Sequence, residues 1–226
     1  MCGRYTVDVS SAELGRMLEA DVAAEWTPSW KIKPTQRVPA FFKTITDDGE
    51  ITGKGEIARW SLLPPWAESP KLKFPTFNAR SEGLASKNTW RGPIKHSRAI
   101  LPATGYYEWK TEGKTKTPNY IHLPDGPLLF AGLYSWWRPK GSDDAWTLTT
   151  TIVTRPSTGD VAELHDRAPV ILPPDFVDEW VDAGTEGDQT LVDAAVAAST
   201  PQLEQLEFHE VAKLTGDGPE LVKPSS

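Results

Sequence analysis

Short runs of apolar and β-branched residues, separated by glycine and proline, are the feature that most limits the fold of this sequence. The 226-residue chain contains 17 Gly and 20 Pro, and these residues mark turns between runs of strand length. Strands are predicted at residues 37–43, 56–62, 98–102, 105–110, 118–123, 128–134, 147–153 and 206–211. The pattern predicts an α+β fold rich in β structure, either a distorted barrel or two packed antiparallel sheets with a few peripheral helices.

Sequence patterns typical of helices are fewer than those of strands and lie outside the predicted strands. Ser10 and Glu13 have the spacing of a capping box, which predicts a short helix directly after them. Residues 175–183 and 190–198 have the apolar spacing of amphipathic helices. Residues 64–82 are proline-rich and irregular, and a long loop of this kind is usually functional or disordered.

Composition excludes several classes of protein. A single cysteine excludes an internal disulfide framework and a multi-cysteine zinc site. No apolar run approaches a membrane span, and no signal peptide is visible, so the reducing cytoplasm is the expected compartment. No glycine-rich phosphate loop or metal-ligand spacing occurs, so neither a nucleotide cofactor nor a metal is expected. One domain over residues 1–226 is predicted, as a monomer whose C-terminus frays from about residue 218.

The net charge of −7 disfavours nucleic acid, but its distribution changes that conclusion. Residues 1–155 hold 21 Lys and Arg against 16 Asp and Glu, a balance of +5. Residues 156–226 hold 3 against 15, a balance of −12. A basic face opposite an acidic back suits a polyanion, although the acidic segment also fits an ordinary solvated helical surface.

Ten tryptophans are a high number for this length. Some must belong to the core, and others offer flat faces on which bases or sugars stack. Those that occur outside periodic apolar patterns are Trp30, Trp60, Trp66, Trp136 and Trp137.

Cys2, the only cysteine, follows the initiator methionine. Removal of Met1 would leave a free α-amine and a thiol on adjacent carbons, and both are partly nucleophilic near neutral pH. The amine can form an imine with an aldehyde, and the thiol can close on it to give a thiazolidine. Alternatively, the thiol attacks an acyl carbon with the amine as base, or Cys2 is an unremarkable residue at a frayed terminus.

Two further residues are candidates for proton transfer. His165 precedes Asp166, which would orient it or pair with Arg167, ahead of a strand expected at residues 170–172. A surface turn held by a salt bridge is the alternative.

Strand alternation places Glu108 on one face with Tyr106 and Lys110. A carboxyl group among aromatic rings is desolvated, which raises its pKa toward the range of general acid–base catalysis. The alternative is a half-exposed glutamate paired with Lys110 or Lys114.

Three polar residues suit phosphate binding. Asn78 and Arg80 flank Ala79, so in an extended segment both side chains face the same way as a donor-rich fork. Arg4 would share a face with Cys2, and a cation there lowers the thiol pKa and attracts anions. The alternative for Arg80 is a structural role in tying down its loop.

Taken in order, these segments resemble the SRAP (SOS response-associated peptidase) family, whose members crosslink to abasic sites in single-stranded DNA. The resemblance covers nearly the whole chain. The motifs that carry it are Met1–Tyr5, Pro34, Trp60–Trp66, Asn78–Glu82, Arg98–Ile100, Gly105–Trp109, Ile152–Thr154 and His165–Leu172.

The resemblance implies a role for each candidate residue. Cys2 would form a thiazolidine with the ring-opened sugar aldehyde, and Asn78 would support that linkage. Glu108 would act as acid–base in imine chemistry and in removal of Met1, while His165 would help open the sugar ring. Single-stranded DNA would be contacted by Arg4, Trp66, Arg80 and Thr154.

Two departures from the family pattern concern DNA contacts. Lys31 and Lys33 stand where the family has Asn and Ala, so no helper Asn can be transferred there. Residues 211–217 lack the Asn-rich turn that usually precedes the final Gly-Pro-Glu-Leu.

Three other functions compete with covalent capture of abasic sites. An N-terminal-nucleophile amidohydrolase of the glutaminase type also begins Met-Cys-Gly, but it gives no role to Glu108 or His165. A Cys–His peptidase would pair Cys2 with His165. A non-catalytic single-strand-binding module would use tryptophans and basic residues without forming a covalent bond.

Overall fold

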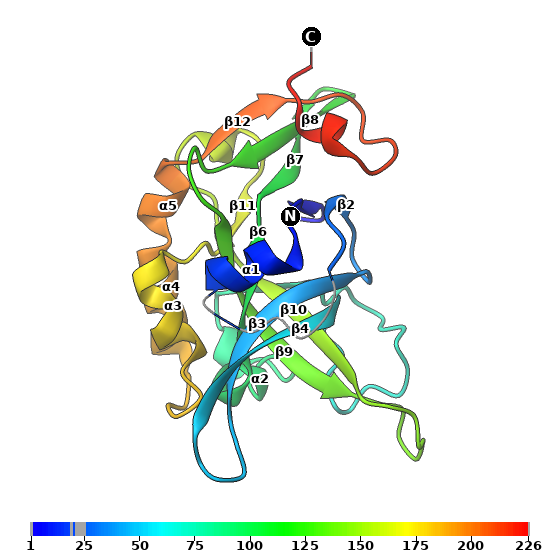
Figure 1. The fold of residues 1–226 in the computed structure, drawn as a ribbon. Coiled ribbons are helices and arrows are strands. Elements are labelled where there is room, and N and C mark those ends of the chain that lie inside the picture. The colour runs from blue at the N-terminus through cyan, green and yellow to red at the C-terminus, as the bar shows by residue number, and fades with distance from the viewer. Residues whose placement is uncertain (1, 19, 21–25, 226) are drawn as a thin grey trace.

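Two β-sheets that meet near the N-terminus form the framework of the protein (Figure 1). The computed structural model describes residues 2–18, 20 and 26–225. The first sheet has the strand order β12-β8-β7-β1-β2. Its strands are β1 (Tyr5–Val7), β2 (Ser29–Ile32), β7 (Gly105–Glu112), β8 (Thr115–His122) and β12 (Glu207–Glu210).

The second sheet has seven strands and curls round on itself. Pairing of β9 with β10 joins the two ends of the path β10-β4-β3-β6-β9, which makes a ring but not a regular barrel. Of the two predicted architectures, the packed sheets are confirmed. The strands are β3 (Arg37–Ile45), β4 (Ile51–Trp60), β5 (Asn78–Arg80), β6 (Arg98–Ala103), β9 (Leu128–Trp137), β10 (Thr147–Pro156) and β11 (Arg167–Pro169).

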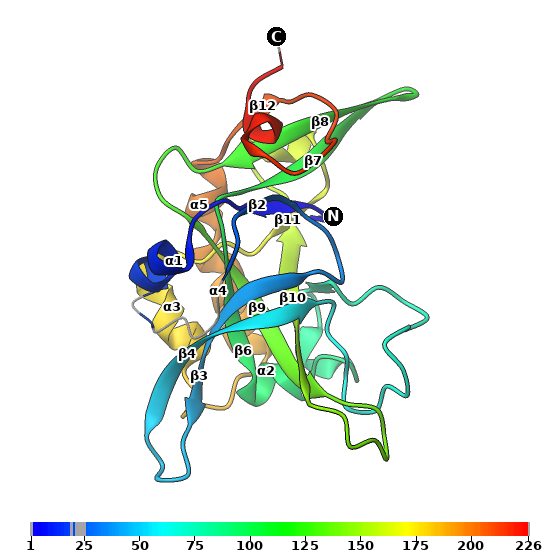
Figure 2. The same ribbon diagram turned by 45° about the vertical axis from the view of Figure 1, so that its right-hand side comes forward.

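Helices cover one side of this framework. In Figure 2, α3, α4 and α5 lie toward the left, and the N-terminus lies on the right. No helix in the described ranges is long and apolar enough to cross a membrane. The α-helices are α1 (Ser11–Leu18), α2 (Pro93–His96), α3 (Pro174–Val181), α4 (Gln189–Ala198) and α5 (Thr200–Glu204), and the 3₁₀ helices are η1 (Leu84–Ser86), η2 (Asp160–Glu163) and η3 (Pro219–Val222).

The predicted strands and helices are present, with two local corrections. The capping box is confirmed, because Ser10 donates its backbone N–H (2.8 Å) and its hydroxyl (2.7 Å) to the Glu13 carboxylate. Asn78–Arg80 is a short strand rather than loop, since it pairs in parallel with β10. The strand expected at residues 170–172 is wrong, because pairing with β10 begins at Arg167 and ends at Pro169, beyond which Ile171 makes one isolated bridge.

The tryptophans divide between core and surface. Trp60 is fully buried, packed edge-on against Tyr5 at 4.9 Å between ring centroids, and Trp137 is also buried. Trp66 and Trp136 are instead 55% and 44% exposed. The buried members therefore stabilise the sheets, and the exposed ones are available for stacking.

Arg98 is a buried arginine that ties the helical side to the second sheet. It is 3% exposed, and its guanidinium donates to five backbone carbonyl oxygens. A buried cation is tolerated when its donors are satisfied in this way. The five acceptors belong to Ile94, Lys95, Trp180, Asp182 and Thr185.

Replacing Arg98 with alanine is expected to lower the free energy of unfolding by about 3–5 kcal/mol, because it leaves buried carbonyl groups without donors. Arg91→Ala removes an exposed arginine from the same region and should change the free energy by less than about 0.5 kcal/mol. Urea unfolding of both variants tests the difference. Equal small losses would show that Arg98 is not a structural tie.

Candidate active site

The first candidate, Cys2, lies three residues before the start of β1 and is buried with no exposed surface. Strand β1 pairs with β7, so Tyr5 lies opposite Tyr106, and the Tyr107 N–H donates to the Arg4 carbonyl at 2.9 Å. This pairing brings the N-terminal segment alongside the strand that carries Glu108. Burial raises the pKa of the Cys2 thiol, and the Glu108 carboxylate raises it further. The predicted removal of Met1 concerns a residue outside the described ranges.

Asn78 holds the backbone of Cys2 from the second sheet. Its Nδ2 donates to the Cys2 carbonyl oxygen at 2.9 Å, and its Oδ1 is buried without a hydrogen-bond partner in the described part of the chain. The preceding residue is anchored because Trp60 Nε1 donates to the Phe77 carbonyl at 2.8 Å. Asn78, on β5 of the second sheet, therefore holds the segment that leads into β1 of the first sheet. Its Oδ1 is left to accept a hydrogen bond.

Glu108 is a buried carboxyl group close to Cys2. It is 4% exposed, and burial raises its pKa to about 7, with a further contribution from the negative charge of Asp166. The alternative of a half-exposed glutamate paired with Lys110 or Lys114 is wrong, because Glu108 is buried and Lys110 contacts Glu112 at 3.3 Å. Glu108 can thus donate or accept a proton near neutral pH.

The raised pKa of Glu108 makes the stability of the fold depend on pH. The protonated form is favoured in the folded state, so the free energy of unfolding is expected to fall as pH rises from about 4.5 to about 7. Glu108→Gln should remove this dependence and increase the free energy of unfolding by about 3 kcal/mol at pH 8, with little change at pH 4. Exposed Glu112→Gln is the matched control for urea unfolding at both pH values. An equal effect of the two substitutions would contradict the buried, raised-pKa state of Glu108.

His165 follows η2 and lies at the turn that leads into β11. Its Nδ1 lies 2.7 Å from the Asp166 carboxylate and 3.0 Å from the Arg167 backbone N–H. Burial lowers the pKa of this imidazole, Arg167 lowers it further, and Asp166 opposes both. The contact fits both predicted alternatives, an Asp166 that orients His165 and a surface turn held by a salt bridge, so the role of His165 stays a prediction. Asp166 also raises the pKa of Glu108, so the neighbour of His165 lies within electrostatic range of Glu108, and a single site of Cys2, Asn78, Glu108 and His165 stays a prediction.

The predicted phosphate-binding residues occupy different environments. Arg80 is exposed on β5, opposite the fully buried Thr154 of β10. The Thr154 hydroxyl accepts from Arg167 Nη2 at 3.3 Å. Arg4 is half-buried and donates to the Gly3 carbonyl. Arg80 is therefore the member of this set that is most accessible to a ligand, and the phosphate contacts of all three residues stay predictions.

The ion pair between Arg167 and Glu82, next to Thr154, was not predicted from the sequence. Arg167 is buried, and both terminal nitrogens of its guanidinium contact the Glu82 carboxylate, one of them at 3.0 Å. Arg167 Nη2 also donates to the Thr154 carbonyl at 2.7 Å. The hydrogen bonds from Arg167 lower the pKa of Glu82 to about 2. Both residues stand in the motifs that carried the family resemblance, but the sequence did not pair them.

Trp66 lies on the irregular segment between β4 and β5, outside the buried site. In Figure 2 this segment extends on the same side of the molecule as the N-terminus. The segment begins and ends beside β10, because the Ser61 N–H donates to the Thr150 carbonyl and the Ile152 N–H to the Phe77 carbonyl. Trp66 is therefore carried on a loop rooted next to Asn78.

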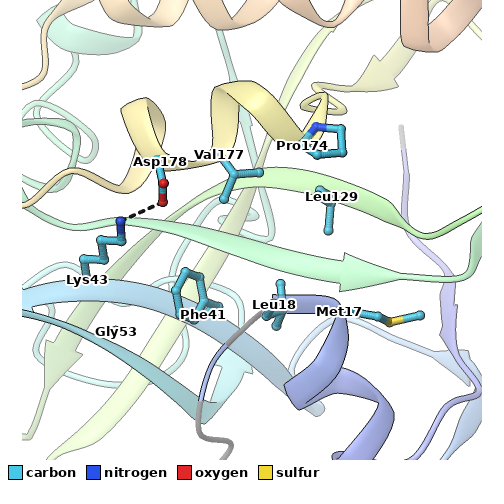
Figure 3. Close-up of a pocket in the computed structure, with 9 residues that line it drawn as sticks. All are labelled: Met17, Leu18, Phe41, Lys43, Gly53, Leu129, Pro174, Val177 and Asp178. Carbon is cyan, nitrogen blue, oxygen red and sulfur yellow. Dashed lines mark hydrogen bonds and ion pairs between the residues drawn. The ribbon is translucent and has the colours of Figure 1, made fainter.

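A separate pocket of about 430 Å³ lies between α1, β3 and α3 (Figure 3). Its two charged groups, Lys43 and Asp178, pair with each other at 2.6 Å, and its other lining residues are largely apolar. None of the candidate site residues lines it. The described residues also contain no group of three or more His, Cys, Asp or Glu that could hold a metal ion.

Comparison with known proteins gives consistent matches. A family model described as SOS response associated peptidase (SRAP) matches residues 1–217. Abasic site processing protein YoqW of Bacillus subtilis is 36% identical over 187 residues, covering 80% of each chain. Abasic site processing protein YobE of Bacillus subtilis is 32% identical over 228 residues, covering 99% of each chain. A crystal structure of a protein from Bacteroides thetaiotaomicron shares the fold, with a TM-score of 0.80 at 20% identity over both whole chains.

Proposed function

Because the chain belongs to the SOS response associated peptidase (SRAP) family, we propose that it processes abasic sites in DNA by covalent capture through Cys2. The names of YoqW and YobE support the abasic site as substrate. The observation that carries the mechanism is the position of Cys2, buried next to the raised-pKa carboxyl group of Glu108 and bonded to Asn78. The captured strand is single-stranded DNA.

The reaction begins when removal of Met1 frees the α-amine of Cys2. This amine adds to the aldehyde carbon of the ring-opened sugar, and the resulting carbinolamine loses water to give an imine. The thiol then adds to the imine carbon, the imine nitrogen takes up the thiol proton, and a thiazolidine ring closes. Overall, one water molecule is released and no oxidant or reductant is needed.

Glu108 and His165 supply the proton transfers. With a pKa of about 7, Glu108 donates a proton to the departing hydroxyl group of the carbinolamine and recovers one later. We assign to Glu108 the removal of Met1 as well, by the same acid–base chemistry. His165, oriented by Asp166, protonates the ring oxygen of the sugar as the aldehyde opens. Asn78 fixes the Cys2 carbonyl, which holds the amine and the thiol toward the sugar.

The state of the thiol separates this mechanism from the amidohydrolase and peptidase alternatives. Both of those reactions need a Cys2 thiolate as the first nucleophile, and burial of Cys2 disfavours the thiolate. Capture needs the neutral amine first and the thiol second, so the same burial is compatible with it. Ammonia release from glutamine, lost in Cys2→Ala, would instead favour the amidohydrolase.

An uncleavable N-terminal extension tests the proposed function. Wild-type protein mixed with single-stranded DNA carrying one abasic site is expected to give a band that survives heat and detergent. The extended variant keeps the thiol but has no free α-amine on Cys2, so it should give no such band. A heat-stable band of equal strength from the extended variant would contradict capture through the amine.

Phosphate contacts predict a salt dependence for noncovalent binding. With about three phosphates neutralised, the logarithm of the affinity should fall with the logarithm of salt concentration at a slope of about −2 on a single strand. Arg80→Ala should make this slope shallower by about 0.7, whereas Lys54→Ala, on the exposed β3–β4 hairpin, should not change it. Titration of an unreactive abasic analogue measures the slope, and a salt-independent affinity would exclude these contacts.

A further inference from the structure

A groove of about 970 Å³ lies next to Trp66 and has no role in the chemistry at Cys2. One wall is formed by Pro64, Pro65 and Trp66, and the other walls come from residues 88–97 and the end of β9. Trp66 and Trp136 both line it, and each exposes about half of its side chain. The groove therefore presents two large aromatic surfaces to a ligand.

The charge of the groove is positive. Arg91 and Lys95 line it and are exposed, and its lining residues include no aspartate or glutamate. Lys95 also contacts Glu186, which does not line the groove. Exposed aromatic rings combined with cations are the combination that binds unpaired nucleotides, since bases stack on the rings and phosphates pair with the cations.

The walls of the groove are fixed to one another. Trp137 Nε1 donates to the Ala67 carbonyl at 2.8 Å, so the residues next to Trp136 and Trp66 are directly bonded. On the opposite wall, Arg98 binds the carbonyl oxygens of Ile94 and Lys95. A groove with fixed walls loses little conformational entropy when a ligand binds.

Two smaller hollows are lined by residues between Trp66 and Phe77, the neighbour of Asn78. One of about 490 Å³ is lined by Phe77, next to Asn78, and by the exposed Phe74. Another of about 400 Å³ shares Phe74 with it and shares Trp66 with the groove. Arg59, Lys71 and Lys73 line the first of these hollows, whose lining residues again include no acidic side chain. The second hollow is lined by Lys71, Lys73 and one acidic residue, Glu68, so basic side chains outnumber acidic ones along these hollows.

We propose that this groove binds unpaired nucleotides of the captured strand, on the far side of Trp66 from the abasic site. The inference rests on the proposed function and adds a second, noncovalent subsite to it. A DNA strand is favoured over a proline-rich peptide because the charged residues that line the groove are all basic and because Trp66 belongs to the segment that ends next to Asn78. Trp136 supplies a stacking surface, and Arg91 supplies a phosphate contact.

The test measures binding of oligonucleotides that carry an unreactive tetrahydrofuran abasic analogue. A short oligonucleotide is compared with versions extended by unpaired nucleotides on the 5′ side or on the 3′ side. For the wild-type chain, an extension on one side only is expected to raise affinity. Trp136→Ala should reduce this gain in affinity by a factor of about 5 to 150, the range for one stacked base. Arg91→Ala should make the slope of log affinity against log salt concentration shallower by about 0.7.

Two control variants and one parallel assay separate failure of the groove proposal from failure of the proposed function. Trp146→Ala removes another exposed tryptophan that does not line the groove, and Lys54→Ala removes a distant cation. Equal losses in Trp136→Ala and Trp146→Ala, or a proline-rich peptide that binds through Trp136 while DNA extension has no effect, would overturn the proposal. Covalent capture of a reactive abasic oligonucleotide by the wild-type chain is measured alongside. Failed capture would overturn the proposed function. Successful capture, with no gain in affinity from either extension, would overturn only the proposal that the groove binds nucleotides.

Discussion

Cys2→Ala is expected to abolish the heat-stable adduct with abasic single-stranded DNA. Alanine keeps the α-amine after Met1 removal, so the variant can still form an imine with the sugar aldehyde. Without a thiol, that imine cannot close to a thiazolidine and is hydrolysed when the protein is denatured. The measurement is a denaturing gel of wild-type and variant protein after equal incubation times.

Reduction of the imine provides the control for this result. Addition of borohydride during incubation should convert the imine of Cys2→Ala into a stable amine, so that a band appears only under those conditions. Recovery of the band would show that the variant is folded and binds the substrate. A heat-stable band from Cys2→Ala without borohydride would contradict the role of the thiol.

The second large effect is expected for Glu108→Gln prepared with Met1 already removed, which should slow adduct formation by about 10²- to 10⁴-fold, the usual contribution of general acid–base catalysis. Glutamine preserves the size of the side chain and cannot deliver the proton. In the wild-type protein, the α-amine must be neutral while Glu108 is protonated, so the rate should pass through a maximum between the pKa of Glu108, about 7, and the ordinary pKa of an α-amine, about 7.7–8.0, and fall at higher pH. The variant should lose the falling limb.

Single-turnover rates across pH, measured for Glu108→Gln and for Glu112→Gln, separate a catalytic role from a structural one. Glu112 is an exposed glutamate on the same strand, so its substitution should leave the rate and the pH profile unchanged. A Glu108→Gln variant with a normal rate, or with an unchanged falling limb, would exclude Glu108 as the proton donor.

The sequence predicted the parts of this protein that depend on local patterns. Strand alternation predicted that Asn78 and Arg80 face the same way in an extended segment, and in β5 both are more exposed than Ala79 between them. The capping box located α1, because its bonds join residues three positions apart. The sequence also identified the aminothiol that removal of Met1 would create at Cys2, and the chemistry of that group stays a prediction.

The rest depends on which strands pair across the chain. The ion pair of Glu82 with Arg167 forms because β5 and β11 both pair with β10, opposite Thr154, and no local pattern encodes that arrangement. Similarly, Arg98 stood in a recognised motif, but its five carbonyl acceptors lie in segments that only the packed helices bring together. The burial that sets the pKa of Glu108 likewise follows from the meeting of the two sheets.

Mass spectrometry of the crosslinked N-terminal peptide is the most direct test of covalent capture through Cys2. The expected peptide begins at Cys2, lacks Met1 and carries the ring-opened sugar minus one water molecule. Because a thiazolidine has no imine bond, treatment with cyanoborohydride should leave this mass unchanged. An adduct on a lysine, an adduct on a peptide that retains Met1, or a gain of two hydrogen atoms on reduction would contradict thiazolidine formation at Cys2.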